Sequence, residues 1–446
     1  MIEPGSGAHS SSAAFVSLGC FKNLVDSEVL GGLLHQSGLR IAAEYEPSDW
    51  LIVNTCGFIR DAKEEGIAEI IKALEKKEQG EVRHVAVVGC LPQRYLKELR
   101  AGFPAVDLFW GVNDWPELVR AIVAGPAAGQ RNYPDRDLFL YSHDQPRIMA
   151  TTLNTTFIKI SEGCNMTCSF CVIPRIRGRY RSRTIDSIRR EAEQYRQRGV
   201  QELNLVSQNS TFFGRDRQPQ SQLPELLQEI ARLKFPWVRV LYLMPEEVND
   251  DMIAAFDQPT VLPYFDLPFQ HVDPLILKKM NRGGDPEKNL DLINRIRRRF
   301  PAAIIRSTFI TGFPGEGPAR FARLLDFASR SAIERIGVFA FSAEEGSPAF
   351  QLPGRVSERV ARERKERLLD VSDQNLLRYN RGLVGTTQEF LPLGPWTDHS
   401  TIGRIASQAP EVDGLTRVNR PFNDDYRIVP IRIGGYDQEM LHGEKI

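Results

Sequence analysis

Short apolar runs alternate with amphipathic helical patterns along most of this chain, and this alternation constrains its fold more than any other feature. The first runs are Phe15–Leu18, Trp50–Val53 and Val85–Val88, and helical patterns such as Leu24–Leu34 and Ala62–Leu74 separate them. Strand–helix alternation implies a parallel sheet with right-handed crossovers. We therefore predict an α/β fold that opens with a parallel α/β sheet domain.

The alternation continues through the middle of the chain. The predicted strands there are Thr156–Ile160, Glu202–Val206, Val238–Leu243, Tyr264–Leu267, Ile304–Ile310 and Arg335–Phe341. The predicted helices between and after them are Thr184–Arg198, Leu223–Leu233, Pro286–Arg299, Pro318–Ser329 and Val356–Tyr379. Six such units predict an incomplete (βα)6 barrel rather than the closed eightfold one, with a lateral opening for a large substrate.

The end of the chain changes character. Short strands are predicted at Gln388–Leu393, Thr401–Ile405, Leu415–Asn419 and Tyr426–Ile433, with Gly, Pro and Asp between them. This pattern predicts a small closed β-barrel. The predicted domains are a flexible leader (1–13), the first sheet domain (14–130), a linker (131–149), the barrel core (150–381) and the C-terminal β-barrel (382–446).

The start of the chain raises a question of localisation. Ser17-Leu18-Gly19-Cys20 resembles a lipoprotein cleavage box, but Met1–Ala14 contains no Lys or Arg. A signal peptide needs a basic start followed by an apolar run. The sequence also has no apolar stretch long enough for an ordinary transmembrane helix. We expect a cytoplasmic protein whose thiols stay reduced and can bind metal.

The net charge of zero conceals an uneven distribution. Up to Gln130 there are 12 Lys and Arg and 17 Asp and Glu, and from Leu383 onward there are 6 and 9. The centre of the chain is therefore basic and its two ends are mildly acidic. An acidic terminal barrel does not favour nucleic acid as its partner.

Three of the six cysteines follow the first three predicted strands: Cys20, Cys56 and Cys90. The carboxyl ends of parallel strands share one edge of a sheet, where ligand crevices form. The sequence therefore predicts that the three thiols gather at one metal site. The alternative is three buried structural cysteines.

The other three cysteines, Cys164, Cys168 and Cys171, directly follow the first strand of the middle domain. Their C-x3-C-x2-C spacing leaves one iron of a 4Fe-4S cluster without a protein ligand. In metal sites an open position is typical of a reactive centre. The alternative is a structural zinc with a distant His as its fourth ligand.

This triplet, with Phe170 before its last cysteine, resembles the radical S-adenosylmethionine (SAM) superfamily. The resemblance implies that the open iron binds SAM and that its reductive cleavage gives a deoxyadenosyl radical. Leu18–Glu28, Asn54–Phe58 and Val88–Leu91 resemble the three cysteine motifs of the methylthiotransferases. That similarity implies a second 4Fe-4S cluster on Cys20, Cys56 and Cys90 that carries the transferred sulfur.

Other segments resemble those methylthiotransferases that act on ribosomal protein S12: Glu162–Gly178, Tyr264–His271, Glu344–Ala349 and Ala409–Gly414. The terminal barrel resembles the TRAM module, which in tRNA-modifying relatives is expected to bind RNA. Ribosomal proteins are generally basic, so the acidic barrel is complementary to a protein surface instead.

The resemblance also implies residues that contact SAM. They are Phe170, the turn Gly312, Phe313, Pro314, Gly315 and Glu316, and the strand end Ser207, Gln208 and Asn209. The alternative for the turn is a tight strand-to-helix connection with Pro at the first helical position.

Five arginines recur at every second position: Arg175, Arg177, Arg179, Arg181 and Arg183. In an extended segment all five would point one way. We interpret Arg177, Arg179 and Arg181 as a patch that steers the substrate loop or nearby ribosomal RNA. The alternative is a solvated edge.

The sequence thus predicts a radical SAM methylthiotransferase that converts an aspartate of S12, free or in the small subunit, to its β-methylthio derivative. It would use two 4Fe-4S clusters, SAM, an external electron donor such as a flavodoxin, and an external sulfur source. One alternative is a tRNA methylthiotransferase acting on N6-modified adenosine. Another is a non-enzymatic iron–sulfur sensor.

Overall fold

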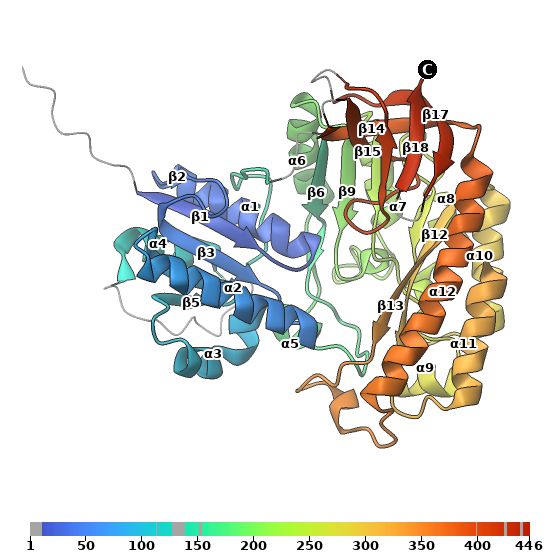
Figure 1. Ribbon diagram of the computed structural model, residues 1–446, viewed down its shortest axis with the longest axis horizontal. Helices are drawn as coiled ribbons and strands as arrows, with labels where there is room; N and C mark the ends of the chain where they lie inside the picture. The colour runs from blue at the N-terminus through green and yellow to red at the C-terminus, as the bar shows by residue number, and fades with distance from the viewer. Residues whose placement is uncertain are drawn as a thin grey trace, which may run out of the picture. The chain divides into compact units, whose positions relative to one another are not determined.

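The computed structural model describes residues 11–112, 114–126, 139–150, 154–397, 399–422, 426–437 and 440–446 (Figure 1). It divides into two compact units, each described separately below. The first unit comprises Met1–Ala150, Gly163–Asn165 and Val172–Arg179, and the second comprises the rest. The C-terminal barrel is thus part of the same unit as the barrel core.

The boundaries of the leader and linker differ from the prediction or lie outside the described residues. The first strand begins at Ser12, so the predicted leader extends two residues too far. Residues 1–10 and 131–138, the latter being the first part of the predicted linker, lie outside the described part of the chain. Residues 139–149 contain no helix or strand.

The first unit is built on a five-stranded parallel sheet in the order β2-β1-β3-β4-β5. Its strands are β1 (Ser12–Ser17), β2 (Arg40–Ile41), β3 (Ser48–Thr55), β4 (Val82–Gly89) and β5 (Leu108–Trp110). Its helices are α1 (Phe21–Gln36), α2 (Arg60–Glu78), α3 (Cys90–Gly102), α4 (Trp115–Ala124) and α5 (Ile173–Arg177).

Strand β3 shows why both faces of this sheet must be covered. Trp50 and Ile52 belong to the core that includes side chains of α1 and α4. Leu51 and Val53 belong to a separate core with side chains of α2 and α3. Alternate side chains point to opposite faces of a strand, so a continuous apolar run requires helices on both sides. The predicted parallel sheet is confirmed.

The second unit contains six parallel strands arranged in two three-stranded sheets, β10-β9-β6 and β11-β12-β13. The strands are β6 (Thr155–Lys159), β9 (Glu202–Val206), β10 (Trp237–Val240), β11 (Tyr264–Asp266), β12 (Ile304–Thr311) and β13 (Arg335–Ala340). The helices are α6 (Ile185–Gln197), α7 (Leu223–Ala231), α8 (Asp250–Ala254), α9 (Pro274–Met280), α10 (Pro286–Arg299), α11 (Pro318–Ser331) and α12 (Glu358–Leu383). Strands β7 (Ser161–Glu162) and β8 (Arg181–Ser182) form a small antiparallel pair.

The two sheets are continuous where β10 meets β11. Val238 bridges Val261, and the Leu243 N–H donates to the Asp266 carbonyl at 2.9 Å. The strands therefore follow one another in chain order, as an incomplete barrel requires. The predicted architecture of the core is confirmed.

The C-terminal strands form a closed barrel in the order β14-β15-β16-β18-β17. They are β14 (Thr387–Thr397), β15 (Ser400–Ile405), β16 (Leu415–Val418), β17 (Val429–Tyr436) and β18 (Met440–Lys445). The sequence did not predict β18, because His442, Gly443 and Glu444 interrupt any apolar alternation.

A buried polar network joins the C-terminal barrel to the amino ends of the core strands. Glu202, the first residue of β9, binds Arg404 of β15 and lies 3.1 Å from Arg239 of β10. The hydroxyl of Tyr264, the first residue of β11, donates to Asp413 at 2.5 Å. The barrel therefore covers the end of these strands opposite the one that leads into the cysteine triplet (Figure 1).

None of the helices in the described residues is long and apolar enough to span a bilayer.

Candidate functional site

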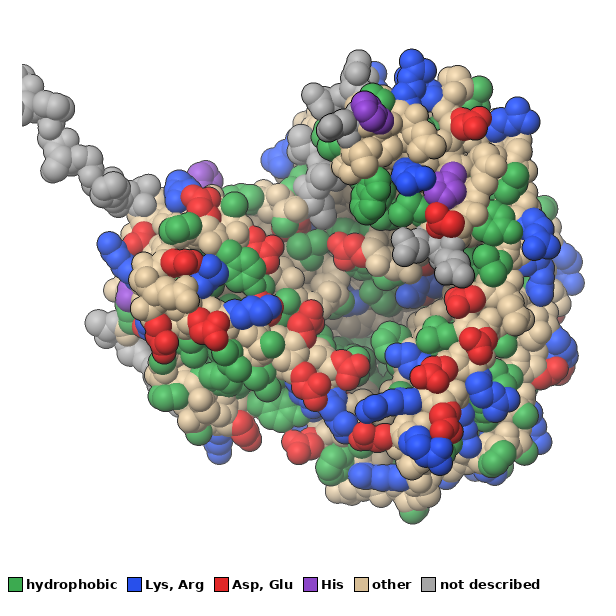
Figure 2. Space-filling view, viewed as in Figure 1, with side chains coloured by type: hydrophobic (Ala, Val, Ile, Leu, Met, Phe, Trp, Pro, Cys, Tyr) green, Lys and Arg blue, Asp and Glu red, His purple; other side chains and the backbone are tan. Residues whose placement is uncertain are grey.

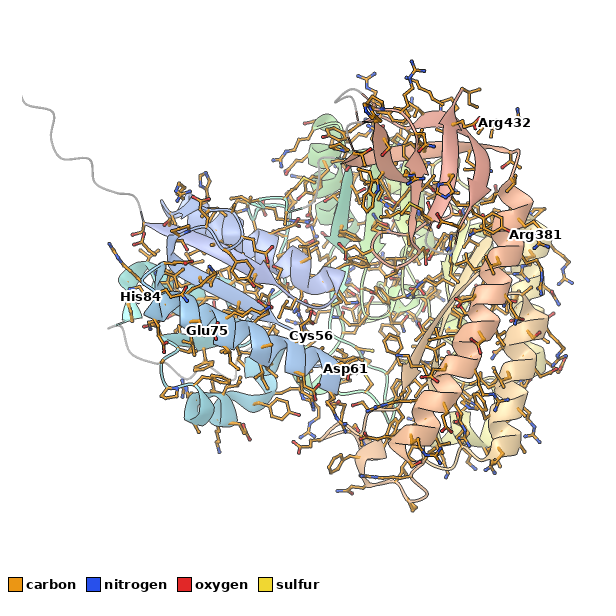
Figure 3. The ribbon with its side chains drawn as sticks, viewed as in Figure 1. Cys56, Asp61, Glu75, His84, Arg381 and Arg432 are labelled. Atoms are coloured by element: carbon orange, nitrogen blue, oxygen red, sulfur yellow. The ribbon has the colours of Figure 1, made fainter. Side chains whose placement is uncertain are left out.

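Three cysteines of the first unit lie at the carboxyl ends of neighbouring strands. Cys20 caps α1 after β1, Cys56 follows β3, and Cys90 begins α3 directly after β4. Strand β3 pairs with both β1 and β4, so the three loops meet at one edge of the sheet. In Figure 3 Cys56 lies beside the start of α2, near Asp61.

Three glycines allow these loops to approach one another. A Cβ at Gly19 (φ +90°) would lie 2.7 Å from the Cys56 Cβ. One at Gly57 would lie 2.8 Å from the Cys90 carbonyl oxygen, and one at Gly89 (φ +98°) only 2.3 Å from the Asn54 Oδ1. Any larger residue would push the cysteine loops apart, so these glycines are part of the site.

Gly57→Ala tests this packing. We expect it to lower the iron bound by Cys20, Cys56 and Cys90 and to cost about 1–3 kcal/mol of stability, because the new methyl group meets rigid backbone. Iron analysis and thermal unfolding measure the two effects. Gly102→Ala is the matched control, since nothing lies within 4 Å of its Cβ position. Equal iron content in the two variants would contradict the proposed role of the close approach.

The Asn23 side chain ties the loops together. Its Nδ2 donates to the carbonyl oxygens of Leu18 and Thr55, both at 3.1 Å. Its Oδ1 lies 3.6 Å from the Cys90 Sγ. Asn23 thus contacts all three cysteine-bearing connections, a role that its sequence position alone did not reveal.

Burial and neighbouring charges shift the pKa values of the three thiols. Desolvation and the neighbouring Cys90 and Cys20 raise the pKa of Cys56 to about 12. Desolvation also raises the pKa of Cys90, against the effect of Arg177. Desolvation acts the same way on Cys20, but Lys22, Arg177 and backbone N–H groups outweigh it and lower its pKa. The thiolates of Cys56 and Cys90 are thus disfavoured here unless a cation replaces their protons.

The donor set fits an iron–sulfur cluster. Three convergent thiols from three loops can bind three irons of a 4Fe-4S cluster and leave the fourth open. Each cysteine sulfur that holds such a cluster binds a different iron, so the three cysteine sulfurs need not meet at one point. Within the described residues, no three His, Cys, Asp or Glu side chains are grouped closely enough to hold a single metal ion.

The cysteine triplet is divided between the two compact units. Cys164, in the first unit, is buried, and its N–H donates to the Gly178 carbonyl at 3.1 Å. The preceding Gly163 has φ +80°, and a Cβ there would lie 2.2 Å from the Arg179 carbonyl oxygen. Glycine is therefore required immediately before the first cysteine of the triplet.

Cys168 and Cys171 belong to the second unit, where backbone hydrogen bonds hold their loop. The Cys171 N–H donates to the Cys168 carbonyl at 3.1 Å. Between them, Ser169 donates to the Met280 carbonyl at 2.9 Å and accepts from the Ala349 N–H at 2.8 Å. The end of α9 and the loop after β13 thus fix the positions of both cysteines.

A buried arginine contacts Cys168. Desolvation raises the pKa of the Cys168 thiol, while a hydrogen bond from Arg282 acts in the opposite direction. Glu246 holds the Arg282 guanidinium through two bonds of 2.7 and 3.0 Å. Neither Arg282 nor Glu246 was predicted from sequence, since each is an ordinary charged residue on a segment far from the triplet.

Phe170 packs in an apolar cluster with side chains of α9, Ile310 and Phe313. The turn that follows β12 contains Gly312 (φ +76°) and Gly315 (φ +90°). The structure therefore brings the predicted Phe170 and the predicted turn together. The apolar cluster shields this side of the cysteine loop from water.

Glu316 fixes this turn from within. It is buried, accepts from the Gly312 N–H at 2.9 Å and from Arg364 at 2.6 Å, and lies 3.1 Å from the His271 Nε2. Its carboxylate is thus engaged with protein groups, which favours a positioning role for Glu316 over direct contact with SAM.

Ser207, Gln208 and Asn209 lie just beyond the carboxyl end of β9. The Ser207 Oγ accepts from the Asn209 N–H at 3.0 Å, the Gln208 amide donates to Glu162 at 3.0 Å, and the Asn209 amide donates to Glu247 at 2.9 Å. Contact of these three side chains with SAM stays a prediction.

The arginine repeat does not form the extended strip that the sequence predicted. Its first part, Ile173–Arg177, is the helix α5. Arg177 and Arg183 are buried in ion pairs, and Arg181 is partly buried. Arg177 therefore cannot steer a substrate from the surface. The regular spacing is misleading because helix, turn and strand follow one another within nine residues. A steering role for Arg179 and Arg181 stays a prediction.

Comparison with known proteins agrees with this geometry. Residues 158–328 match the radical SAM superfamily, and residues 12–111 match the family described as uncharacterized protein family UPF0004. The chain is 42% identical over 446 residues to the ribosomal protein uS12 methylthiotransferase RimO of Syntrophus aciditrophicus, covering 98% of each chain. It is 39% identical to the RimO of Syntrophotalea carbinolica, covering 97% of this chain and 96% of that one.

Solved structures show the same fold at low sequence identity. The radical SAM methyltransferase TsrM of Kitasatospora setae, solved with cobalamin and a [4Fe-4S] cluster, gives a TM-score of 0.54 at 14% identity. The match covers 74% of this chain and 75% of that one. On this similarity and the residues above, the chain belongs to the uS12 methylthiotransferase family of radical SAM enzymes.

Proposed function

We propose that this enzyme methylthiolates the β-carbon of a specific aspartate of ribosomal protein S12, using two 4Fe-4S clusters and two molecules of SAM. The observation that carries the proposal is the division of all six cysteines into two groups of three, each following strand ends. The names of the relatives, which span nearly the whole chain, support S12 as the substrate.

Cys164, Cys168 and Cys171 would hold the cluster whose open iron binds SAM and whose electron cleaves it to methionine and a deoxyadenosyl radical. Arg282, held by Glu246, keeps a positive charge beside the buried Cys168. The apolar cluster around Phe170 excludes water, which would otherwise compete with substrate for a reactive intermediate. Glu316 fixes the turn whose glycine backbone can approach SAM.

Cys20, Cys56 and Cys90 would hold the cluster that carries the sulfur for transfer. The chain brings their loops together through Gly19, Gly57 and the Asn23 amide, as described above. The protons of these thiols would leave when the cluster binds, since the raised pKa values of Cys56 and Cys90 keep them protonated otherwise. The electron donor, such as a flavodoxin, and the sulfur source would be supplied by other proteins or metabolites of the cytoplasm.

The C-terminal barrel favours a protein partner over RNA. Its balance of charge is acidic, and on the face shown in Figure 2 its Lys and Arg side chains are interspersed with Asp and Glu. Because it covers the amino ends of the core strands, the barrel would hold the body of S12 rather than the aspartate that reacts. Nearby ribosomal RNA is a further possible contact of the exposed Arg179.

Mass spectrometry of S12 and of bulk tRNA from a strain lacking this gene tests the proposal. We expect S12 to lose the mass of one methylthio group and tRNA to stay unchanged. A complementing wild-type copy should restore the S12 modification, and a copy with Cys56→Ala should not. Loss of a methylthio group from tRNA adenosines, with S12 unaffected, would establish the tRNA enzyme instead.

A further inference from the structure

Arg177 is a buried arginine that reaches the sulfur of a predicted cluster ligand. Its Nη2 donates to the Cys90 Sγ at 3.2 Å and to the Asn23 Oδ1. Its Nη1 donates to the Asp26 Oδ2 at 2.6 Å, and both side chains of this ion pair are almost fully buried, at 3% and 4% exposed. All four residues belong to the first compact unit.

The position of Arg177 in the chain is unusual for such a role. It follows Cys171 by six residues in sequence, yet residues 172–179 are grouped with the first unit. Val172 and Ile176 pack with Cys90, Val112 and the partly buried Phe58 in a small apolar core. Packing of Val172 and Ile176 therefore fixes α5 on the first unit, and the ion pair with Asp26 holds the guanidinium in place.

A buried arginine is retained only where its charge is compensated. Asp26 alone would compensate Arg177, so the additional hydrogen bond to Cys90 is not needed to keep the pair buried. Hydrogen bonds to the sulfurs and the net charge nearby set the reduction potentials of iron–sulfur clusters. A donor and a positive charge at the Cys90 sulfur stabilise the reduced, more negative state of any cluster bound there.

We propose that Arg177 is a positioning residue of the auxiliary site, defined as Cys20, Cys56 and Cys90. It orients the Cys90 sulfur and raises the reduction potential of the cluster bound there. Asp26 orients the guanidinium and partly offsets its charge. This inference rests on the proposed second cluster.

The test uses the full chain with Cys164, Cys168 and Cys171 replaced by Ala, so that only the auxiliary site can hold a cluster. After anaerobic reconstitution, iron analysis gives the cluster content and redox titration followed by electron paramagnetic resonance gives the potential. If this parent chain binds no cluster, the proposal of a second cluster is wrong, and the proposed role of Arg177 is wrong with it. If the parent binds one, the variants test Arg177 alone.

In this background Arg177→Gln is expected to shift the potential to a more negative value, because a positive charge is lost. Asp26→Asn is expected to shift it in the opposite direction, because a negative charge is lost. Arg177→Lys, which keeps the positive charge, should have a reduction potential between that of Arg177→Gln and that of the parent chain. A role limited to folding would change stability and iron content in both variants without opposite shifts in potential.

Arg175→Gln is the matched control, since Arg175 is exposed on the same short helix. If Arg177→Gln does not fold because Asp26 is left unpaired, the double variant Arg177→Leu/Asp26→Asn removes both buried charges together with the donor to Cys90. The cluster of this double variant should still have a more negative reduction potential than the cluster of the parent chain, since the hydrogen bond to Cys90 is lost. An unchanged potential in the cluster-bound Arg177 variants, or shifts in the same direction for Arg177→Gln and Asp26→Asn, would overturn the proposal.

Discussion

Replacing Cys56 by Ala is expected to leave SAM cleavage intact and to abolish sulfur insertion, whereas Cys168→Ala is expected to abolish both. Cys56 lies at the edge of the first sheet, and Cys168 lies in the triplet that follows β6. We propose that the two residues belong to different sites with different chemistry. Chromatography of methionine and deoxyadenosine measures cleavage, and mass spectrometry of S12 measures insertion.

The two variants control for each other, because each removes one thiol from a three-cysteine group. With both variants we expect methylthiolated S12 to fall below the limit of detection. Deoxyadenosine should be lost only with Cys168→Ala. Methylthiolated S12 with either variant, or loss of cleavage in a Cys56→Ala protein that still holds the cluster of the triplet, would contradict the assignment of the two sites.

Replacing Glu202 by Ala is expected to destabilise the second unit by about 3–5 kcal/mol, the usual cost of removing one partner of a buried ion pair. Glu202 and Arg239 are fully buried and Arg404 nearly so, and without the carboxylate both guanidinium groups would lie unpaired between the core strands and the C-terminal barrel. Chemical denaturation of the variant measures the loss.

Glu229→Ala is the matched control, because Glu229 pairs with the largely exposed Arg232. Exposed pairs contribute about 0–1 kcal/mol. If Glu202→Ala lowered the free energy of unfolding no more than the control does, this would contradict the view that the network holds the C-terminal barrel to the core.

The same network predicts a dependence of stability on pH. Desolvation raises the pKa of Glu202, but Arg404 and Arg239 outweigh it and hold the pKa below its ordinary value. A carboxyl group with a lowered folded-state pKa stabilises the protein above its ordinary pKa, and this contribution is lost as the pH falls through the lowered value. The difference in stability between wild type and Glu202→Ala should therefore shrink in strong acid.

The sequence predicted most of the architecture, because the sheets are buried on both faces and continuous apolar runs reveal such strands. It did not predict β2 or β5, which have only two and three residues. It also did not predict β18, whose polar residues are placed by closure of the barrel rather than by local pattern. Strand boundaries and edges depend on tertiary contacts that periodicity cannot show.

The cysteine groups were predictable because spacing and position after strands are local properties of a sequence. The sequence did not predict the contacts that Asn23, Arg177 and Arg282 make with the cysteines. These contacts depend on segments that meet only in the fold. Arg177 shows the difference most clearly. Its every-second spacing suggested an exposed strip, but Ile176 packs into an apolar core, and the helix this requires turns Arg177 toward Asp26 and Cys90.

The proposed chemistry requires two separate clusters in one chain. The most direct test is iron and sulfide analysis with Mössbauer spectroscopy of the anaerobically reconstituted protein, beside the variant in which Cys20, Cys56 and Cys90 are all Ala. We expect two four-iron clusters per chain in the wild type and one in the variant, which should still cleave SAM. A single cluster in the wild type, or equal iron in the two proteins, would contradict the account.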